Sequence, residues 1–234
     1  MVNDRARQVW DLPVRIFHWA LVVLVTLLWL TGEFGGFDIS GEYPLLGYLY
    51  LSNMDVHALL GQGVLVLVVF RILWGLFGSS TARFSGFVRG PATVFREVRA
   101  LLRGDVPESS GHNPLGALMV LALLALLGFQ AVSGLFAEDD LFFSGPLAGM
   151  VSGDTSKTLT SLHKQSFSVL QVLILLHVVA VLYYLVRGRN LIAAMFSGTK
   201  KYLDDTTQVT IAPWWRALIC FGASLGGVYW LVNF

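Results

Sequence analysis

Residues 162–177 read LHKQSFSVLQVLILLH, an apolar stretch with His163 at one end and His177 at the other. On an α-helix, the spacing between these histidines corresponds to about 21 Å, and it brings the second ring to within about 40° of the first. One helix therefore presents two imidazoles on the same face, near opposite sides of a hydrocarbon core about 30 Å thick. Ionisable groups at membrane depth are costly, so such a pair indicates function.

The composition of the whole chain is that of an integral membrane protein. Its 234 residues are 55% hydrophobic and 13% charged, whereas a soluble domain carries about 25% charged residues. The one cysteine, Cys220, lies in an apolar run, which excludes a disulfide framework and the C-x-x-C-H attachment of covalent haem. A net charge of +1 with no basic stripe gives no indication of a nucleic-acid partner.

Five apolar segments are each close to the ~20 residues that a spanning helix needs. Because backbone groups in lipid must be satisfied within the segment, all five are predicted to be helices, and the fold is predicted to be all-α. The segments are 14–32, 56–78, 114–137, 162–187 and 213–233. We expect residues 1–200 to form a haem domain, and residues 201–234 to form a linker and an extra C-terminal helix.

Basic residues indicate the orientation of these helices. They gather before the first segment and in the second and fourth connections, whereas the third connection has only Lys157, with Lys164 just inside the next helix. The basic residues are Arg5, Arg7, Arg15, Arg83, Arg89, Arg96, Arg99, Arg103, Arg187, Arg189, Lys200 and Lys201. The positive-inside rule then places the N-terminus in the cytoplasm and the C-terminus outside.

This topology predicts how the histidines pair. His18 lies at the cytoplasmic end of the first segment and His57 at the outer end of the second. The helix carrying His163 and His177 enters from outside, so the matching depths are His57 with His163 and His18 with His177. Imidazoles facing each other at one depth are axial ligands suited to b-type haem, and two pairs predict two haems in a four-helix bundle. The alternative, hydrogen bonding of each histidine to a neighbouring helix, is disfavoured by the pairwise match of all four.

Three other polar residues lie on the cytoplasmic side. Arg71 either binds a haem propionate at the depth of the inner pair, His18 with His177, or extends its charge to the membrane surface. His112 precedes Asn113 and Pro114, which predict a helix N-cap and first turn. His112 is then a solvent-exposed histidine of the capping turn or, as the alternative, a proton-exchanging group with a near-neutral pKa beside a quinone pocket. Arg15, one turn before His18, either joins that pocket or binds a propionate.

Two connections and two glycines carry further expectations. From Pro91 onward, apolar residues share one face, while Arg96, Glu97, Arg99 and Arg103 share the other, which predicts an amphipathic helix on the cytoplasmic surface. The outer loop 33–55 is expected to pack as a lid. Gly61 and Gly63 either admit a flat macrocycle or serve contacts between helices.

Several strings resemble the prokaryotic cytochrome b561 family, which is grouped with the cytochrome b subunits of nickel–iron hydrogenases. They are VWDLPVRIFHW (9–19), VHALLGQG (56–63), FRILWG (70–75), FSGFVRGP (84–91) and GHNPLG (111–116). The resemblance covers roughly residues 8–200. It implies a four-helix transmembrane bundle in a bacterial inner membrane, holding two b haems on His18, His57, His163 and His177. The segment after Pro213 lies beyond this pattern.

A haem ligated by histidine on both sides transfers single electrons. We therefore expect electron transfer between the quinone pool and an extracytoplasmic redox partner such as a periplasmic c-type cytochrome. Two alternatives are the membrane anchor of a hydrogenase-like oxidoreductase and a superoxide:quinone oxidoreductase. The outer loops are acidic, which favours a basic protein partner over a small anion, although Lys157 and Lys164 flank His163. Quinone is expected to meet the inner haem near Arg15 and His112.

Overall fold

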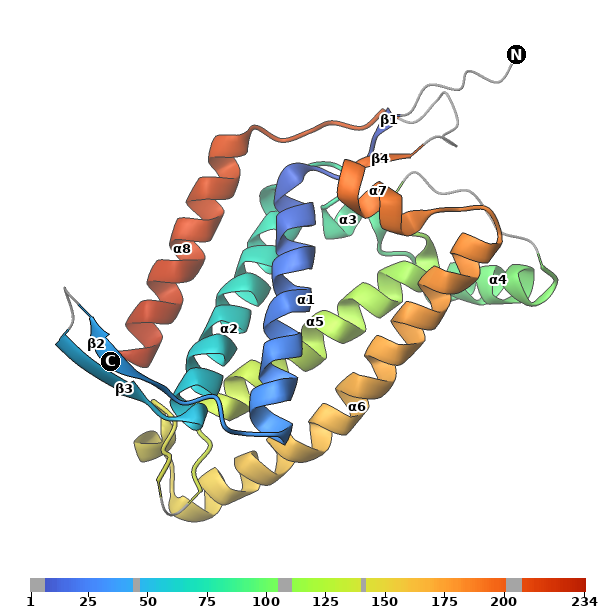
Figure 1. Cartoon of the computed structure of the whole chain (residues 1–234). Coiled ribbons are helices and arrows are strands. Elements are labelled where there is room, and N and C mark those ends of the chain that lie inside the picture. Colours follow the sequence, from blue (N-terminus) through green and yellow to red (C-terminus); the bar gives the residue numbers. More distant parts are fainter. Residues whose placement is uncertain (1–6, 44–46, 105–110, 140–141, 201–207) are drawn as a thin grey trace.

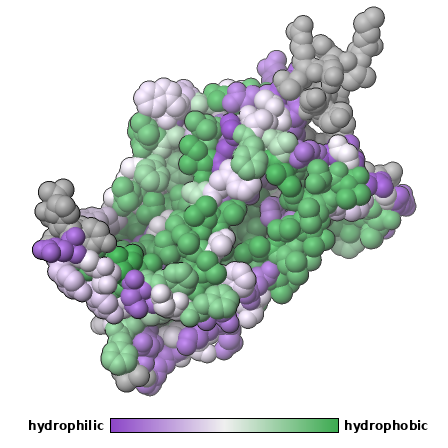
Figure 2. All heavy atoms as spheres, in the orientation of Figure 1, coloured by the Kyte–Doolittle hydropathy of each residue, from purple (hydrophilic) through white to green (hydrophobic). Residues whose placement is uncertain are grey.

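Five long helices dominate the computed structural model, which describes residues 7–43, 47–104, 111–139, 142–200 and 208–234. They are α1 (Leu12–Glu33), α2 (Asn53–Phe77), α5 (Pro114–Leu135), α6 (Gly153–Val186) and α8 (Trp214–Val232). Each is long and apolar enough to span a membrane, and most of its residues are not covered by other parts of the protein. Figure 2 shows this apolar surface as a broad band with hydrophilic residues toward both ends. The chain is a multi-pass membrane protein, as predicted.

Helix α2 lies at the centre of the arrangement. It packs against α1, α5 and α8, while α6 packs against α5 (Figure 1). Val64 and Val68 of α2 meet Leu127 of α5 and Leu170 of α6 in a buried apolar cluster. Helix α8 lies outside this four-helix core, on the side of α2 that faces away from α6.

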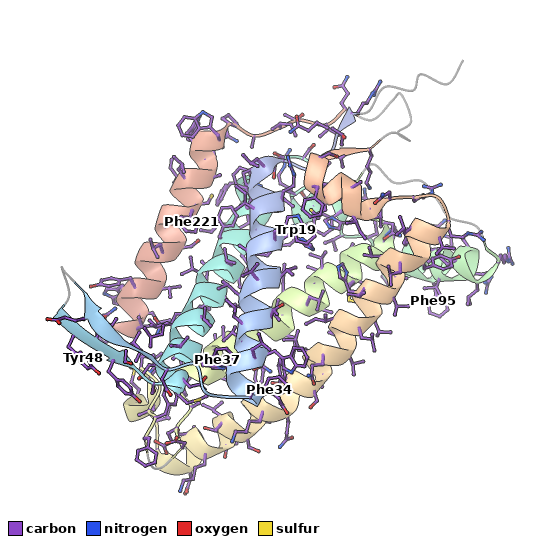
Figure 3. The ribbon with its side chains drawn as sticks, viewed as in Figure 1. Trp19, Phe34, Phe37, Tyr48, Phe95 and Phe221 are labelled. Atoms are coloured by element: carbon purple, nitrogen blue, oxygen red, sulfur yellow. The ribbon has the colours of Figure 1, made fainter. Side chains whose placement is uncertain are left out.

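Short elements connect the long helices. On the side of the N-terminus, β1 (Arg7–Gln8) pairs antiparallel with β4 (Thr199–Lys200). The other helices are α3 (Phe84–Phe87), α4 (Pro91–Leu102), a 3-10 turn (Ala148–Met150) and α7 (Leu191–Ser197). The loop 33–55 contains an antiparallel hairpin of β2 (Ile39–Tyr43) and β3 (Gly47–Leu51), with Ile39 opposite Leu51. Its exposed Tyr48 is labelled in Figure 3.

Side-chain caps explain where the helices start. Asp11 Oδ1 accepts from the Val14 amide at 2.9 Å, and Oδ2 accepts from Trp74 Nε1 at 3.0 Å, which ties α1 to α2. Ser52 and Asp55 form a capping box on α2. Asn113 caps α5 with Pro114 in its first turn, which confirms the predicted start.

Helix α6 begins nine residues earlier than predicted, at Gly153 rather than at 162. The added turns are polar, and their hydroxyls hold the preceding connection. Ser156 is fully buried and donates to the Phe136 carbonyl at 2.6 Å, and Thr160 Oγ1 accepts from the Glu138 amide at 3.1 Å. An apolar-run criterion cannot detect a helix that extends past the membrane in this way.

Helix α4 also differs from its prediction. Glu97, expected on the polar exposed face, is buried with 6% exposure, while Phe95 and Leu102 are strongly exposed. Phe95 projects away from the bundle in Figure 3. The carboxylate turns inward because it hydrogen-bonds the backbone of Leu115 near the start of α5, and burial raises the pKa of Glu97. Of the basic residues used for orientation, Arg5 and Lys201 lie outside the described residues, as does Asp140 of the loops expected to be acidic.

Candidate functional site

The four histidines of the long helices form two facing pairs. His18 of α1 faces His177 of α6, with ring centroids 6.4 Å apart and an interplanar angle of 55°. His57 of α2 faces His163 of α6, with centroids 6.3 Å apart and an angle of 76°. These are the two pairs that matching depth predicts, and α6 contributes one ring to each.

The spacing within each pair can be compared with what a shared iron requires. Two imidazoles that bind one metal ion from opposite sides, each through a bond of about 2.0 Å, have ring centroids about 6.2 Å apart once the ring radius is included. Both observed separations lie close to this value. Rings in direct contact would lie nearer to each other than this. The two pairs therefore fit iron with two axial histidines, although ligation itself stays a prediction.

A threonine and a glycine of α1 position the ring of His57. The Thr31 hydroxyl lies 2.9 Å from His57 Nδ1, and it donates its own hydrogen to the Leu27 carbonyl at 2.8 Å. Thr31 therefore accepts from Nδ1–H, which leaves Nε2 with its lone pair for a metal. The next residue, Gly32, lies against the same ring: a Cβ there would be 3.2 Å from His57 Cε1.

A serine and a glycine of α5 repeat this arrangement at His163. Nδ1 of His163 lies 2.9 Å from the Gln130 carbonyl and 3.2 Å from the Ser133 hydroxyl. A carbonyl can only accept, so Nδ1 carries the hydrogen and Nε2 is again free to bind a metal. A Cβ on Gly134 would lie 3.2 Å from His163 Cε1. The Gln130 side chain also donates to the His163 carbonyl at 3.0 Å.

In the other pair, the ring of His18 lacks such a partner among the described residues. Nδ1 of His18 is buried and has no hydrogen-bond partner among the residues that the structure describes. The ring packs edge-on against Trp19, with centroids 4.9 Å apart, and Trp19 in turn stacks on Phe196 of α7, with centroids 4.3 Å apart. Trp19 is labelled in Figure 3. The inner rings are thus held by packing, and the outer rings by hydrogen bonds as well.

Arg71 of α2 is a buried cation near the inner pair. Its exposure is 2%, so the alternative in which its charge reaches the membrane surface is wrong. The guanidinium lies over the rings of Phe84 and Phe87, at 5.1 and 5.9 Å from their centroids. Nη1 and Nη2 have no hydrogen-bond partner within the described part of the chain. Because a buried charge needs a partner, this site fits a carboxylate such as a haem propionate.

His112 is enclosed rather than solvent-exposed. Its ring packs between Trp10 and Phe87, with centroids at 4.6 and 4.8 Å, because the turn before α5 folds under β1 and α3. Burial, followed by the charges of Arg71 and Lys200, lowers the pKa of His112 to about 3. Both expectations for His112 are therefore wrong, the exposed ring and the near-neutral pKa, because neither allowed for the tertiary contacts.

Arg15 is occupied by the backbone of α7. Its Nε donates to the Met195 carbonyl at 3.3 Å, and Nη2 donates to the Phe196 carbonyl, so it caps the C-terminal end of that helix. Arg15 also lines an apolar groove of about 750 Å³ between α1, α2, α7 and α8, with Trp19 and Phe221 among its walls (Figure 3). His112 is not among the residues that line this groove. Of the two residues proposed for one quinone pocket, only Arg15 lines this groove.

The glycines suggested by the sequence differ from those that contact histidine. A Cβ at Gly61 would meet nothing within 4 Å, and one at Gly63 would lie 3.4 Å from Leu24. The residues that sequence reasoning missed are Thr31, Gly32, Gln130, Ser133 and Gly134. A signal was present, since a hydroxyl residue followed by glycine occurs at the outer end of two apolar segments, as Thr31-Gly32 and as Ser133-Gly134.

Comparison with known proteins covers the same region. The family model for prokaryotic cytochrome b561 matches residues 9–198, which include all four paired histidines. The chain is 28% identical over 226 residues to a "Probable Ni/Fe-hydrogenase B-type cytochrome subunit" of Rhizobium leguminosarum bv. viciae, covering 87% of this chain and 92% of that protein. A protein of the same name from Azotobacter vinelandii is 29% identical over 229 residues, with the same coverage. No solved structure matches. Helix α8 lies beyond the matched residues.

Proposed function

The chain belongs to the prokaryotic cytochrome b561 family, and from this premise we propose that it carries electrons across a membrane on two b haems. It is a membrane b-type cytochrome, so haem b is its cofactor. The finer proposal is that His18 with His177 and His57 with His163 each hold one haem, and that the electrons pass between an extracytoplasmic redox protein and quinone.

The observation that carries this proposal is the presence of two imidazole pairs, each with centroids 6.3 to 6.4 Å apart, at two levels of α6. A b haem held by each pair would supply one-electron transfer. The chain's own residues hold the rings in place, keep water out with apolar helices, and offer Arg71 to an inner carboxylate. We propose residues 1–200 as the haem domain and residues 201–234 as a linker with α8.

The placement in the membrane is also a proposal. Basic residues cluster on the side where α1 begins and α6 ends, which supports a cytoplasmic N-terminus and a periplasmic C-terminus in a bacterial inner membrane. The outer pair, His57 with His163, then faces the periplasmic partner. The inner pair, His18 with His177, faces quinone.

The names of the relatives bear on the partner. Both relatives described above are named as hydrogenase cytochrome subunits, which makes a hydrogenase-like oxidoreductase the first partner to test. A periplasmic c-type cytochrome is the second candidate, because the acidic outer loops attract a basic protein. The same acidity repels superoxide, and stopped-flow mixing of superoxide with the oxidised protein tests that alternative directly.

Quinone is proposed to reach the inner pair along the apolar groove between α1 and α8. The groove is lined by Trp19, whose ring touches His18, and by Arg15. We expect quinol-driven haem reduction to slow in an Ala20→Trp variant, which fills the groove, and to be unchanged in His112→Ala. Slower reduction in His112→Ala together with normal reduction in Ala20→Trp would instead place the quinone site near His112.

Haem content and its loss test the main proposal. Purified protein should hold about two non-covalent b haems per chain, low-spin when oxidised, by pyridine haemochrome assay. His57→Ala and His163→Ala should remove one spectral component, and His18→Ala and His177→Ala the other. One haem in the wild type, or loss of the same component in His57→Ala and His177→Ala, contradicts the proposal.

A further inference from the structure

The two histidine pairs differ in the hydrogen-bond acceptors that lie next to Nδ1 of their rings. Both outer rings donate Nδ1–H to an acceptor: His57 to the Thr31 hydroxyl at 2.9 Å, and His163 to the Gln130 carbonyl at 2.9 Å. The Ser133 hydroxyl is a further neighbour of His163, at 3.2 Å, and Leu28 offers a backbone carbonyl to His57. The residues that supply these acceptors are all buried: Thr31 and Ser133 through their hydroxyls, and Gln130 through its backbone carbonyl.

The ring of His18 has no such acceptor in the described ranges, because its buried Nδ1 has no hydrogen-bond partner there. The pair of His18 and His177 therefore contains at least one ring without the contact that both rings of the other pair make.

This difference would act on a bound metal. An imidazole that donates from Nδ1 becomes a more basic ligand at Nε2, which stabilises the oxidised, more positive iron and lowers the reduction potential. Both rings of the outer pair donate in this way and the ring of His18 does not, so the outer site is expected to have the lower reduction potential.

We infer that Thr31 and Ser133 are positioning residues that lower the reduction potential of the outer site, at His57 and His163, below that of the inner site, at His18 and His177. The inference rests on the proposed function in requiring two b haems.

The test is a redox titration of the full-length purified protein, followed by haem absorbance. Two midpoint potentials are expected in the wild type. Thr31→Val keeps the shape of the side chain but removes the acceptor, and it should raise the lower potential only. Thr31→Ser retains the hydroxyl and should keep the wild-type value. Thr26→Val is the matched control on α1, because Thr26 donates only to the Val22 carbonyl and is exposed.

The outcomes separate this inference from the proposed function. The component that shifts in Thr31→Val must be the one lost in His57→Ala, and Ser133→Ala should shift it in the same direction from the side of His163. If Thr31→Val loses its fold, Ser133→Ala alone decides. If the wild type holds two haems but the variants shift the higher-potential component, or shift neither component, the inference is overturned and the proposed function stands. A wild type without two haems overturns the proposed function itself.

Discussion

Replacement of Gly134 by alanine is the sharpest small perturbation of the outer pair. A Cβ at this position would lie 3.2 Å from Cε1 and 3.4 Å from Nδ1 of His163. Ordinary carbon contacts have their optimum at about 3.5–4.0 Å. The ring must therefore move by a few tenths of an ångström, away from the Gln130 carbonyl that orients it or along its axis toward His57.

The expected cost follows from this displacement. Adding a methyl group to a well-packed interior costs about 1–3 kcal/mol, and metal–ligand distances tolerate only about 0.2 Å. Because the cost falls on the ring that holds the haem, we expect it to appear mainly as weaker haem binding at the outer pair. A cost in this range corresponds to about a 5- to 150-fold loss in affinity.

Transfer of haem from the protein to an excess of an apo-globin acceptor measures this loss, and the absorbance spectrum shows which component leaves. Gly128→Ala is the matched control on α5, because its Cβ would meet Val68 at an ordinary 3.7 Å. Gly32→Ala should act like Gly134→Ala through His57. If Gly134→Ala and Gly128→Ala lose haem at the same rate, the proposed role of the glycine is wrong.

Three other changes have defined outcomes. Asp11→Ala removes the cap of α1 and leaves the buried Trp74 Nε1 without an acceptor. The free energy of unfolding should fall by about 2–4 kcal/mol, and the thermal unfolding midpoint should fall with it. An unchanged midpoint would contradict this. Truncation after Lys201 removes α8, which packs on α2 outside the histidine pairs, so both haems should remain in the haemochrome assay. Burial lowers the pKa of His112 to about 3, so below about pH 6.5 the unfolded chain binds a proton at this position that the folded chain does not. The free energy of unfolding should therefore fall as the pH decreases from 6.5 toward 3, by up to about 2 kcal/mol at pH 5. A His112→Gln variant should show a shallower decrease in unfolding midpoint over that range, and an identical decrease would refute the buried, neutral ring.

The membrane helices were predictable because they depend on composition along the chain. Segments 14–32 and 213–233 differ from α1 and α8 by two residues or fewer at each end. Lipid requires about 20 apolar residues in a row whatever the helices pack against. The early start of α6 was missed because its first turns are stabilised by hydroxyl contacts to the preceding connection rather than by hydrophobicity.

Local pattern was insufficient where a side chain could point in more than one direction. Glu97 shares a helical face with arginines, yet it turns toward α5. His112 was expected in water because its neighbours along the chain form a capping turn, but Trp10 and Phe87 enclose it from distant parts of the sequence. Such burial depends on how connections fold over the ends of the helices, which periodicity does not encode.

The sequence by itself determined the membrane class, the five helices and which histidines share a depth, since the rise per residue of a helix converts position in the chain into depth in the bilayer. Only the tertiary structure decided how each ring is held. Thr31 and Gly32 contact His57, and Ser133 contacts His163, because of how the helices are rotated about their axes and how closely they approach. Depth is a property of one helix, whereas a hydrogen bond between helices depends on the relative placement of two.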